Sequence, residues 1–469
     1  MKRLVIYFHY DAQGSLDEPC RFAIRALCTE AELVLVTNGT LSRESRDWVA
    51  GVGLRLIERE NTGFDVGAYR QALLALGRET VSGYEELILM NYTLAGPVCS
   101  LKPMLDAMQT HPELDFWGLT RHYAMRSHRF GGQVPEHLQS HFLAIRQNMM
   151  QADAFWDYWQ KMELPRSYEE SVIRHETRFT RYFSELGYTW DSYVQTEDLK
   201  SVFVNPIMAC PKELLENRGC PFFKRRSFFT PYEDELRRTD GLAARELYEY
   251  LKGRTGYPVD ALLQSLLRTQ PLSSLAKNLH WHYIVGEDGG NPSISLQTQG
   301  LALVRLIVPE RDTVTDWYLR QSVQSAEKQI AQAAALFERN PLLGVLSPAL
   351  PLWPEALRFV RQEWQANRKE LSGQVSVSMG EDPPPAPCAG WALVRRAAFP
   401  QGIPVGKAMQ DIWLLPLLAQ QNGYYSATFE SASQAAARTE HLCMYARAAS
   451  EPAAVVRQLG RLVKHKLKG

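Results

Sequence analysis

The sequence predicts an α/β protein whose first domain is built around a parallel β-sheet. Over the first 120 residues, short continuous apolar runs alternate with helical patterns. Such runs are typical of parallel strands that helices cover on both faces of the sheet. A second alternation begins near residue 276, and 45% of the 469 residues are hydrophobic. That is enough apolar mass for two or three domains rather than one core.

The strands of the first domain are expected in five apolar runs, with helices in the intervals. The runs cover residues 4–10, 32–39, 54–60, 86–92 and 115–120, and the helices lie near 22–27, from 66 and after 101. Parallel strands place their carboxyl ends at one edge of the sheet, where α/β proteins bind ligands. The polar residues at those ends should converge on one crevice: His9, Tyr10, Asp11, Thr37, Asn38, Glu60, Asn61, Asn91, Tyr92 and Thr93.

The remainder is expected to contain aromatic-rich helices after residue 137, a helical connector, a second domain and a tail. In the second domain, strands at 302–308 and 342–348 flank one long helix over about 315–338. The predicted divisions are 1–232, 233–275, 276–445 and 446–469.

Composition and simple motifs exclude several classes of protein. Lys and Arg together number 52, as do Asp and Glu, so we expect no nucleic-acid partner. No apolar run is long enough to cross a bilayer, and the first run is interpreted as a buried strand rather than a signal peptide. Seven cysteines without a CxxC pair favour reduced thiols in the cytoplasm. The chain has neither a GxxxxGK[ST] loop nor a GxGxxG turn, and HETRF at 175–179 lacks the second His of a zinc-protease motif.

The segment ENTGFDVGAYRQAL at 60–73 is the strongest local signal because it directly follows a strand. Gly63 and Gly67 would let the backbone approach a ligand, and Asp65 could accept hydrogen bonds from ligand hydroxyls. Alternatively, Asn61 and Gly63 form a tight turn and Asp65 only caps the following helix. The residues alone leave both interpretations open.

Two further segments could supply charge to a reaction. FFKRRSFF at 222–229 places Lys224, Arg225 and Arg226 between aromatic residues, where they could bind a diphosphate or form a solvated turn. In HETRFTRYFSELGY at 175–188, Glu176 lies at a helix start on nearly the same face as Phe179. Glu176 could act as a general base toward a hydroxyl, or it could pair with neighbouring arginines at the surface.

Six separated blocks resemble the rhamnan synthesis protein F family of bacterial rhamnosyltransferases. They are NTGFDVGAYRQAL, ELILMNYTLAGPV, DFWGLT, HLQSHFLAIR, SYEESVIRHE and PFFKRR, in that order over about residues 1–275. The resemblance implies a GT-A-like nucleotide-binding fold. It also implies transfer of rhamnose or a related deoxysugar from a dTDP-sugar to a lipid-linked glycan. Members usually carry Asn-Asp-Ser where this chain has Asn91-Tyr92-Thr93, so a magnesium or manganese ion lacks its expected carboxylate here.

The second half resembles the closing segment of family 2 glycosyltransferases through residues 388–425. Asp411 precedes Gly423 by twelve residues, much as Glu176 precedes Gly187 by eleven. Two GT-A-like domains in tandem are therefore expected, with Asp411 as a second candidate catalytic residue. Glu310 and Asp312 could mark a degenerate metal site in the second domain, or belong to a polar loop.

The expected mechanism is a single, inverting displacement with Glu176 as base. The donor would be bound by residues of the first domain: His9, Tyr10, Asn38, Asn61, Gly63, Asp65, Gly67, Asn91, Thr93, Lys224 and Arg225. Trp117 and His141 are the expected acceptor contacts. The basic amphipathic tail at 455–469 suits the anionic inner face of the cell membrane, or is a solvated end. The alternatives are a nucleotide-sugar hydrolase or phosphotransferase, and a non-catalytic glycan-binding or assembly subunit.

Overall fold

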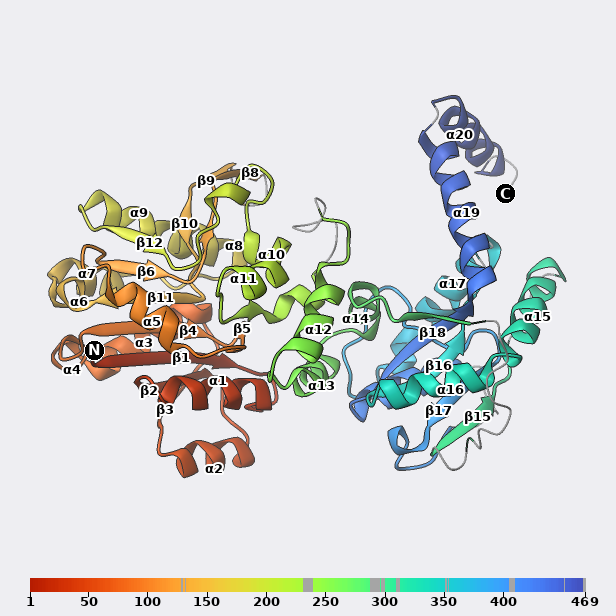
Figure 1. The fold of residues 1–469 in the computed structure, drawn as a ribbon, viewed down its shortest axis with the longest axis horizontal. Helices are drawn as coiled ribbons and strands as arrows, with labels where there is room; N and C mark the ends of the chain where they lie inside the picture. Colours follow the sequence, from red (N-terminus) through yellow and green to blue (C-terminus); the bar gives the residue numbers. More distant parts are fainter. Residues whose placement is uncertain are drawn as a thin grey trace. The chain divides into compact units, whose positions relative to one another are not determined.

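The computed structural model describes residues 1–127, 130, 132–230, 239–286, 296, 300–308, 313–350, 352, 354–404, 410–450 and 452–466. The chain divides into two units, Met1–Ser265 and Leu266–Gly469, each with its own sheet (Figure 1). The finer boundaries near residues 232, 275 and 445 stay predictions.

The first unit is built on a seven-stranded sheet of order β12-β6-β11-β4-β1-β2-β3. Its strands are β1 (Arg3–Tyr10), β2 (Glu32–Asn38), β3 (Arg55–Arg59), β4 (Glu86–Asn91), β6 (Phe116–Gly118), β11 (Phe142–Arg146) and β12 (Trp190–Ser192). β1, β2, β3 and β4 are mutually parallel, as predicted, but β11 runs antiparallel to both β4 and β6. The expectation of helices from residue 137 is therefore wrong for residues 142–146, and the sheet is mixed.

Helices cover both faces of this sheet because both sets of strand side chains are apolar. Leu4, Ile6 and Phe8 of β1 belong to a core shared with α3 (Phe64–Leu76), α7 (Asp153–Lys161) and α9 (Thr177–Glu185). The intervening Val5 and Tyr7 are also fully buried. The predicted α/β class is thus confirmed. The remaining helices of the unit are α1 (Glu18–Cys28), α2 (Arg43–Val52), α4 (Arg78–Ser82), α5 (Lys102–Gln109), α6 (Gln147–Gln151), α8 (Tyr168–Ser171), α10 (Pro206–Ala209), α11 (Pro211–Asn217), α12 (Ala243–Arg254) and α13 (Val259–Thr269).

The described residues of the first unit also form three short strand pairs, one π-helix and two 3₁₀ helices, Glu197–Leu199 and Arg225–Phe228. The pairs are β5 (Leu94–Ala95) with β13 (Phe223–Lys224), β7 (Arg121–His122) with β10 (His137–Leu138), and β8 (Met125–Ser127) with β9 (Gly132–Val134). The π-helix Val172–Glu176 connects α8 to α9. Because π turns are rare and concentrate at functional sites, this one draws attention to Glu176.

The second unit has a five-stranded sheet of order β14-β18-β16-β17-β15. The strands are β14 (His282–Val285), β15 (Leu301–Arg305), β16 (Leu343–Pro348), β17 (Trp391–Arg395) and β18 (Tyr425–Ser431), with β17 antiparallel to both neighbours. The long helix expected over 315–338 is two helices, α15 (Thr313–Glu327) and α16 (Ile330–Arg339). The others are α14 (Leu272–Asn278), α17 (Pro354–Leu371), α18 (Asp411–Gln421), α19 (Ala432–Ser450) and α20 (Pro452–Lys466).

Candidate active site

The carboxyl ends of β1, β2 and β4 lie side by side, as the parallel register requires. His9 is paired with Thr37 across β1 and β2, and Phe8 is paired with Asn91 across β1 and β4. His9 Nδ1 lies 3.4 Å from Thr37 Oγ1. Burial lowers the pKa of His9 to about 4, so its ring is neutral at pH 7. The structure thus brings the expected strand-end residues together at one edge of the sheet.

The loop between β3 and α3 is held to this edge by side-chain hydrogen bonds. Asn38 Nδ2 donates to Asn61 Oδ1 at 3.2 Å, and the Arg59 guanidinium donates to Asn38 and to the Thr62 carbonyl. Gly63, with a φ of 68°, is the N-cap residue of α3, so Asp65 is not the cap. The predicted proximity of Asn38 and Asn61 therefore has a direct structural cause.

Gly63 at the end of this loop and Gly67 in the first turn of α3 are both required by packing within the protein. A Cβ on Gly63 would lie 2.8 Å from Leu164 Cδ2, and one on Gly67 would lie 2.9 Å from the Thr62 carbonyl oxygen. Both glycines therefore permit close packing of the loop; a ligand is not needed to explain them. The next residue, Phe64, has a φ of 53° and an exposed ring, an unusual combination for an aromatic residue that points to a functional constraint.

Asp65 faces the interior of the site from the first turn of α3. Its Oδ2 accepts a hydrogen bond from Asn91 Nδ2 at 2.9 Å and lies 3.1 Å from Ser140 Oγ. Ser140 Oγ is also 2.6 Å from Glu176 Oε2, and the Ser140 backbone N–H donates to the same oxygen at 3.3 Å. A chain of polar contacts therefore links the end of β4 to Glu176.

The single hydroxyl proton of Ser140 can be donated to only one of the two carboxylates at a time. Burial first, and then the charge of Glu176, raise the pKa of Asp65. Burial also opposes the charge on Glu176, but the His137 hydrogen bond and charge, the Ser140 hydrogen bond and Lys224 outweigh it and hold the pKa of Glu176 well below its usual range. The surroundings thus shift the pKa values of the two acids in opposite directions, so that Glu176 is the more acidic of the pair.

His137 completes the surroundings of Glu176. His137 Nε2 lies 3.3 Å from Glu176 Oε1, while Nδ1 lies 2.8 Å from the Pro135 carbonyl oxygen. Both partners are hydrogen-bond acceptors, and the ring of His137 lies between them. The ring of His122 stacks on His137, and burial lowers the pKa of His122 to about 4. Sequence reasoning missed both His137 and Ser140. Their only signal in the sequence was that they are the first and fourth residues of the block HLQSHFLAIR.

Lys224 is the cation of the FFKRRSFF segment that faces the site. The pairing of β13 with β5 positions it, and its Nζ lies 3.1 Å from Thr93 Oγ1. The Thr93 backbone N–H in turn donates to Asn91 Oδ1 at 3.2 Å. The charge of Lys224 also contributes to the low pKa of Glu176. Lys224, Thr93 and Asn91 therefore form the cationic side of the same site.

Arg225 does not fit the donor-binding role expected for it. Its guanidinium is buried against the Asp17 carboxylate, with the Ser265 hydroxyl 2.7 Å away. Burial opposes the charge of Asp17, yet Arg225 holds the pKa of this carboxyl below its usual range. The pair fastens residues 225–228 to the start of α1, so the guanidinium is not open to a diphosphate.

The two expected acceptor contacts are buried. The Trp117 indole is fully buried and donates to Glu86 Oε1 at 2.8 Å. His141 is 2% exposed, and burial, followed by the charge of Lys224, keeps its pKa well below the usual value. Trp117 therefore belongs to the core and cannot stack on a sugar, which corrects that expectation, and His141 supports the site from within.

The residues present do not form a ready set of metal ligands. Among the described residues, no three His, Cys, Asp or Glu side chains surround a common point. Tyr92, which stands where the family usually has Asp, packs edge-on against Phe8 with a centroid separation of 5.8 Å. The two carboxylates of the site, Asp65 and Glu176, both contact Ser140, and the proposed mechanism uses no metal ion.

The remaining predicted residues lie in the second unit and its tail. Asp411 is the first residue of α18, and the expected metal residues Glu310 and Asp312 lie outside the described residues. In the tail, α20 exposes Val455, Val456, Leu459 and Val463. No helix in the described part of the chain is both long enough and apolar enough to cross a membrane.

Comparisons with known proteins agree with the motif blocks. The family model described as rhamnan synthesis protein F matches residues 33–292. An uncharacterised protein, y4gN, of Sinorhizobium fredii is 25% identical over 205 residues, which are 43% of this chain and 51% of that protein. The chain thus spans about half the length of this curated relative.

Solved structures of low similarity also match. One is a mannosyltransferase from Pyrobaculum calidifontis in complex with GDP-Man and Mn²⁺, with 13% identity over 41% of this chain and 54% of that chain and a TM-score of 0.28. Another is a putative nucleotide-diphospho-sugar transferase from Desulfovibrio desulfuricans, with 9% identity, coverage of 41% and 82%, and a TM-score of 0.25.

Proposed function

The chain belongs to the rhamnan synthesis protein F family, and on that premise we propose that it is a GT-A-like glycosyltransferase of polysaccharide synthesis. The proposed donor is a dTDP-sugar carrying rhamnose or a related deoxysugar. The proposed acceptor is a lipid-linked glycan of the bacterial surface. The observation that carries the proposal is the linked set Asp65, Ser140 and Glu176 beside Lys224, at the carboxyl ends of β1 and β4.

In the proposed mechanism, Glu176 takes the proton from an acceptor hydroxyl. The freed oxygen attacks the anomeric carbon of the donor from the face opposite the leaving group. The bond between that carbon and the diphosphate oxygen breaks, its electron pair leaves with the nucleoside diphosphate, and the configuration inverts. Glu176 is ionised at pH 7 because its pKa lies well below its usual range, so its carboxylate can accept a proton; the same low pKa makes it a weak base, and the proton must therefore move as the hydroxyl oxygen attacks.

The proposed donor site is the edge formed by the strand ends and the loop at 60–67. Lys224 would stabilise the charge of the departing diphosphate, as cations do at developing anions. Asn91 donates a hydrogen bond to Asp65, and Thr93 accepts one from Lys224, so both side chains are held in place. The remaining proposed contacts are His9, Tyr10, Asn38, Asn61, Gly63 and Gly67.

Two further parts of the proposal concern the second unit. Asp411 at the start of α18 would be the base of a second GT-A-like domain, and the chain would then make two different linkages. Alternatively, the second domain only holds the acceptor. The exposed apolar residues of α20, together with the basic residues of the tail, would bind the anionic inner face of the cell membrane. The membrane contact of the tail would keep the enzyme on the cytoplasmic side, close to its lipid-linked acceptor.

The second candidate function is a non-catalytic glycan-binding or assembly subunit. Tyr92 favours it, because this residue replaces a carboxylate that the family usually carries. A subunit of this kind would bind glycan but would have no need of a nucleotide sugar.

A thermal-shift panel separates the two functions. The protein is heated with dTDP-, UDP- and GDP-sugars, with and without EDTA. We expect a dTDP-sugar to raise the melting temperature by mass action, with EDTA leaving the shift in place. No response to any nucleotide sugar would contradict the donor assignment. A shift that EDTA abolishes would show that a metal binds despite Tyr92.

A further inference from the structure

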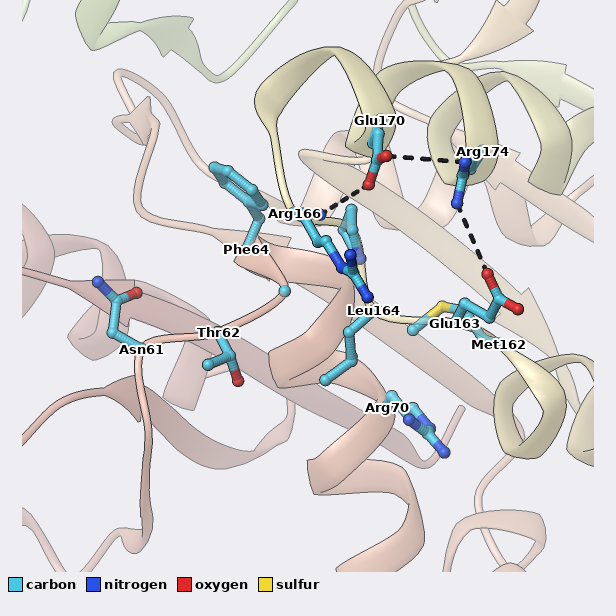
Figure 2. A pocket seen from close by; sticks show the side chains of 12 residues that line it. Asn61, Thr62, Phe64, Arg70, Met162, Glu163, Leu164, Arg166, Glu170 and Arg174 are labelled. Atoms are coloured by element: carbon cyan, nitrogen blue, oxygen red, sulfur yellow. Dashed lines mark hydrogen bonds and ion pairs between the residues drawn. The ribbon is translucent and has the colours of Figure 1, made fainter.

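A pocket of about 840 Å³ lies on the outer side of the loop that carries Gly63. One wall is the loop from Asn61 to Phe64 with Arg70 of α3, and the other is the segment 162–174 (Figure 2). None of the residues that line it belongs to the proposed base or to the Lys224 cluster. Asn61 and Gly63 are also proposed donor contacts, so the pocket adjoins the proposed donor site, whereas its arginines have no role in the proposed mechanism.

The charges in this pocket are predominantly positive. Three arginines, Arg70, Arg166 and Arg174, line it together with two carboxylates, Glu163 and Glu170. Glu170 already accepts the backbone N–H of Arg166 at 2.9 Å and lies 3.6 Å from Arg174. Each carboxylate approaches Arg174 only at 3.6 Å, longer than a hydrogen bond, and Glu163 is 86% exposed.

Two of the arginines have no carboxylate partner. In the part of the chain that the structure describes, no acid lies within ion-pair distance of the Arg166 or the Arg70 guanidinium. Figure 2 shows the dashed ion pairs converging on Arg174, whereas the guanidinium of Arg166 carries none. Arg70 donates one N–H to the Gln160 carbonyl at 3.0 Å, while its buried Nε has no partner. Such guanidinium groups are suited to bind the oxygens of a phosphate.

Apolar side chains stand beside these cations. Phe64 is 39% exposed in its strained backbone conformation, Leu164 is 36% exposed, and both line the pocket with Met162. An anion alone would not require this surface. A ligand with a phosphate and an adjoining apolar or ring-shaped part fits both features.

The pocket is connected to the proposed base through the chain. Glu170 and Arg174 belong to the continuous helical segment of α8 and the π-helix that ends at Glu176, and Phe64 directly precedes Asp65. Resting on the proposed glycosyltransferase function, we propose that this pocket binds the phosphate or diphosphate group of a substrate through Arg166, Arg174 and Arg70. That group belongs either to the lipid-linked acceptor or to the nucleotide donor.

Isothermal titration calorimetry of the full-length protein tests this proposal. It also distinguishes the lipid-linked acceptor from the nucleotide donor as the source of the phosphate. The probes are geranyl diphosphate, which mimics a polyprenyl diphosphate, dTDP, and inorganic pyrophosphate. The variants are Arg166→Gln and Arg174→Gln, and the control is Arg43→Gln, whose side chain is 96% exposed on α2. The melting temperature of each variant verifies that it folds.

We expect wild type and the control to bind a diphosphate probe and each pocket variant to bind it about tenfold more weakly, as the loss of one charge-assisted hydrogen bond predicts. Selective weakening of geranyl diphosphate assigns the pocket to the acceptor, and selective weakening of dTDP assigns it to the donor. If wild type binds none of the probes, or if both variants bind like wild type, the proposal is overturned.

The failure of this proposal can be distinguished from the failure of the proposed function. Thermal stabilisation by a dTDP-sugar together with unchanged probe binding in both pocket variants would refute the pocket and leave the donor assignment standing. Probe binding that depends on Arg166, without any response to nucleotide sugars, would support the pocket and refute the donor assignment.

Discussion

At the scale of single residues, the site depends on two half-buried acids, Asp65 and Glu176, whose pKa values are shifted in opposite directions. Sequence patterning placed Glu176 at the start of a helix near Phe179, but the structure has it inside a continuous helical segment, at the end of the π-helix and directly before α9. Ser140 and His137 are 36 and 39 positions away in the chain, so no local periodicity could connect them to Glu176. Tertiary contacts of that kind decide which acid is ionised, and one sequence does not reveal them.

Replacing Ser140 by Ala is expected to raise the pKa of Glu176, because the ionised carboxylate loses a hydrogen-bond donor. In the wild type, Glu176 stays ionised down to well below pH 4.5, and no acid limb of the transfer rate between pH 5 and 7 should come from it. In the variant, the rate should begin to fall at a higher pH as the solution is acidified. The pH profile of transfer measures this change.

Ser140→Thr keeps the hydroxyl and should restore the wild-type profile. Ser82→Ala is the matched control, since that hydroxyl donates to the Met150 carbonyl away from the site. An unchanged acid limb in Ser140→Ala would show that Ser140 does not set the charge of Glu176.

At the scale of elements, the strands within the five apolar runs were predictable, including the short β6, whereas β11 was not. β1, β2 and β4 are continuous apolar runs whose carboxyl ends meet as expected. β11 was missed because its five residues directly precede the helix α6, so the two form one unbroken stretch with no turn residue between them. The helix expected from residue 66 begins at Phe64, so Gly63 precedes it and Gly67 lies within it. The partners that require these glycines, Leu164 and Thr62, became visible only in the structure.

Replacing Arg225 by Ala is expected to lower the free energy of unfolding by about 3–5 kcal/mol, because it leaves the Asp17 carboxylate buried without its cation. The substitution Arg181→Ala removes an ion pair with Glu185 whose arginine is 71% exposed, and should cost about 1 kcal/mol or less. Urea unfolding of the two variants beside wild type gives both values. If both variants lost the same free energy of unfolding, Arg225 would contribute no more to stability than an exposed surface ion pair, which would contradict this expectation.

At the scale of the whole molecule, sequence analysis anticipated two α/β parts, and the structure contains two units with separate sheets. The family match ends at residue 292, soon after the second unit begins. The role of the second unit thus rests on the weaker resemblance of residues 388–425. Motif spacing could indicate Asp411, but it could not supply the neighbours that would make it a base.

The first unit is expected to lose stability as the pH falls from about 6.5 to 4. Burial lowers the pKa of His9 and of His175 to about 4, whereas an unfolded histidine binds its proton near 6.5. The unfolded chain therefore holds more protons in this window, which costs up to about 1.4 kcal/mol per pH unit for each histidine. Glu176 acts in the same direction at lower pH, since its stabilising charge is lost as the pH falls below about 4.5.

Urea unfolding at pH 7 and pH 5 tests this expectation with His175→Leu, since both ring nitrogens of His175 are buried without a partner. The variant should lose less stability on acidification than wild type. The control His111→Gln, at a side chain that is 54% exposed, should behave like wild type. Equal losses in His175→Leu and wild type would contradict the assignment of acid sensitivity to buried histidines.

The proposed membrane contact of the tail predicts a dependence on lipid charge. Full-length protein should co-sediment with vesicles that contain anionic lipid and much less with zwitterionic vesicles. Val456→Glu and Leu459→Glu, at side chains 68% and 57% exposed on α20, should weaken that binding. Val52→Glu, at an exposed residue of α2, should not. Binding that is insensitive to the α20 substitutions would locate any membrane contact elsewhere.

The central claim is that Glu176 is the base of a sugar transfer from a nucleotide donor. The most direct measurement is the release of nucleoside diphosphate from the dTDP-sugar that stabilises the protein, with bacterial lipid-linked glycan as acceptor, for wild type and Glu176→Gln. The account predicts acceptor-dependent release by wild type and a loss of about 10²–10⁴-fold in the variant, the usual contribution of a general base. Turnover by Glu176→Gln at the wild-type rate would contradict it.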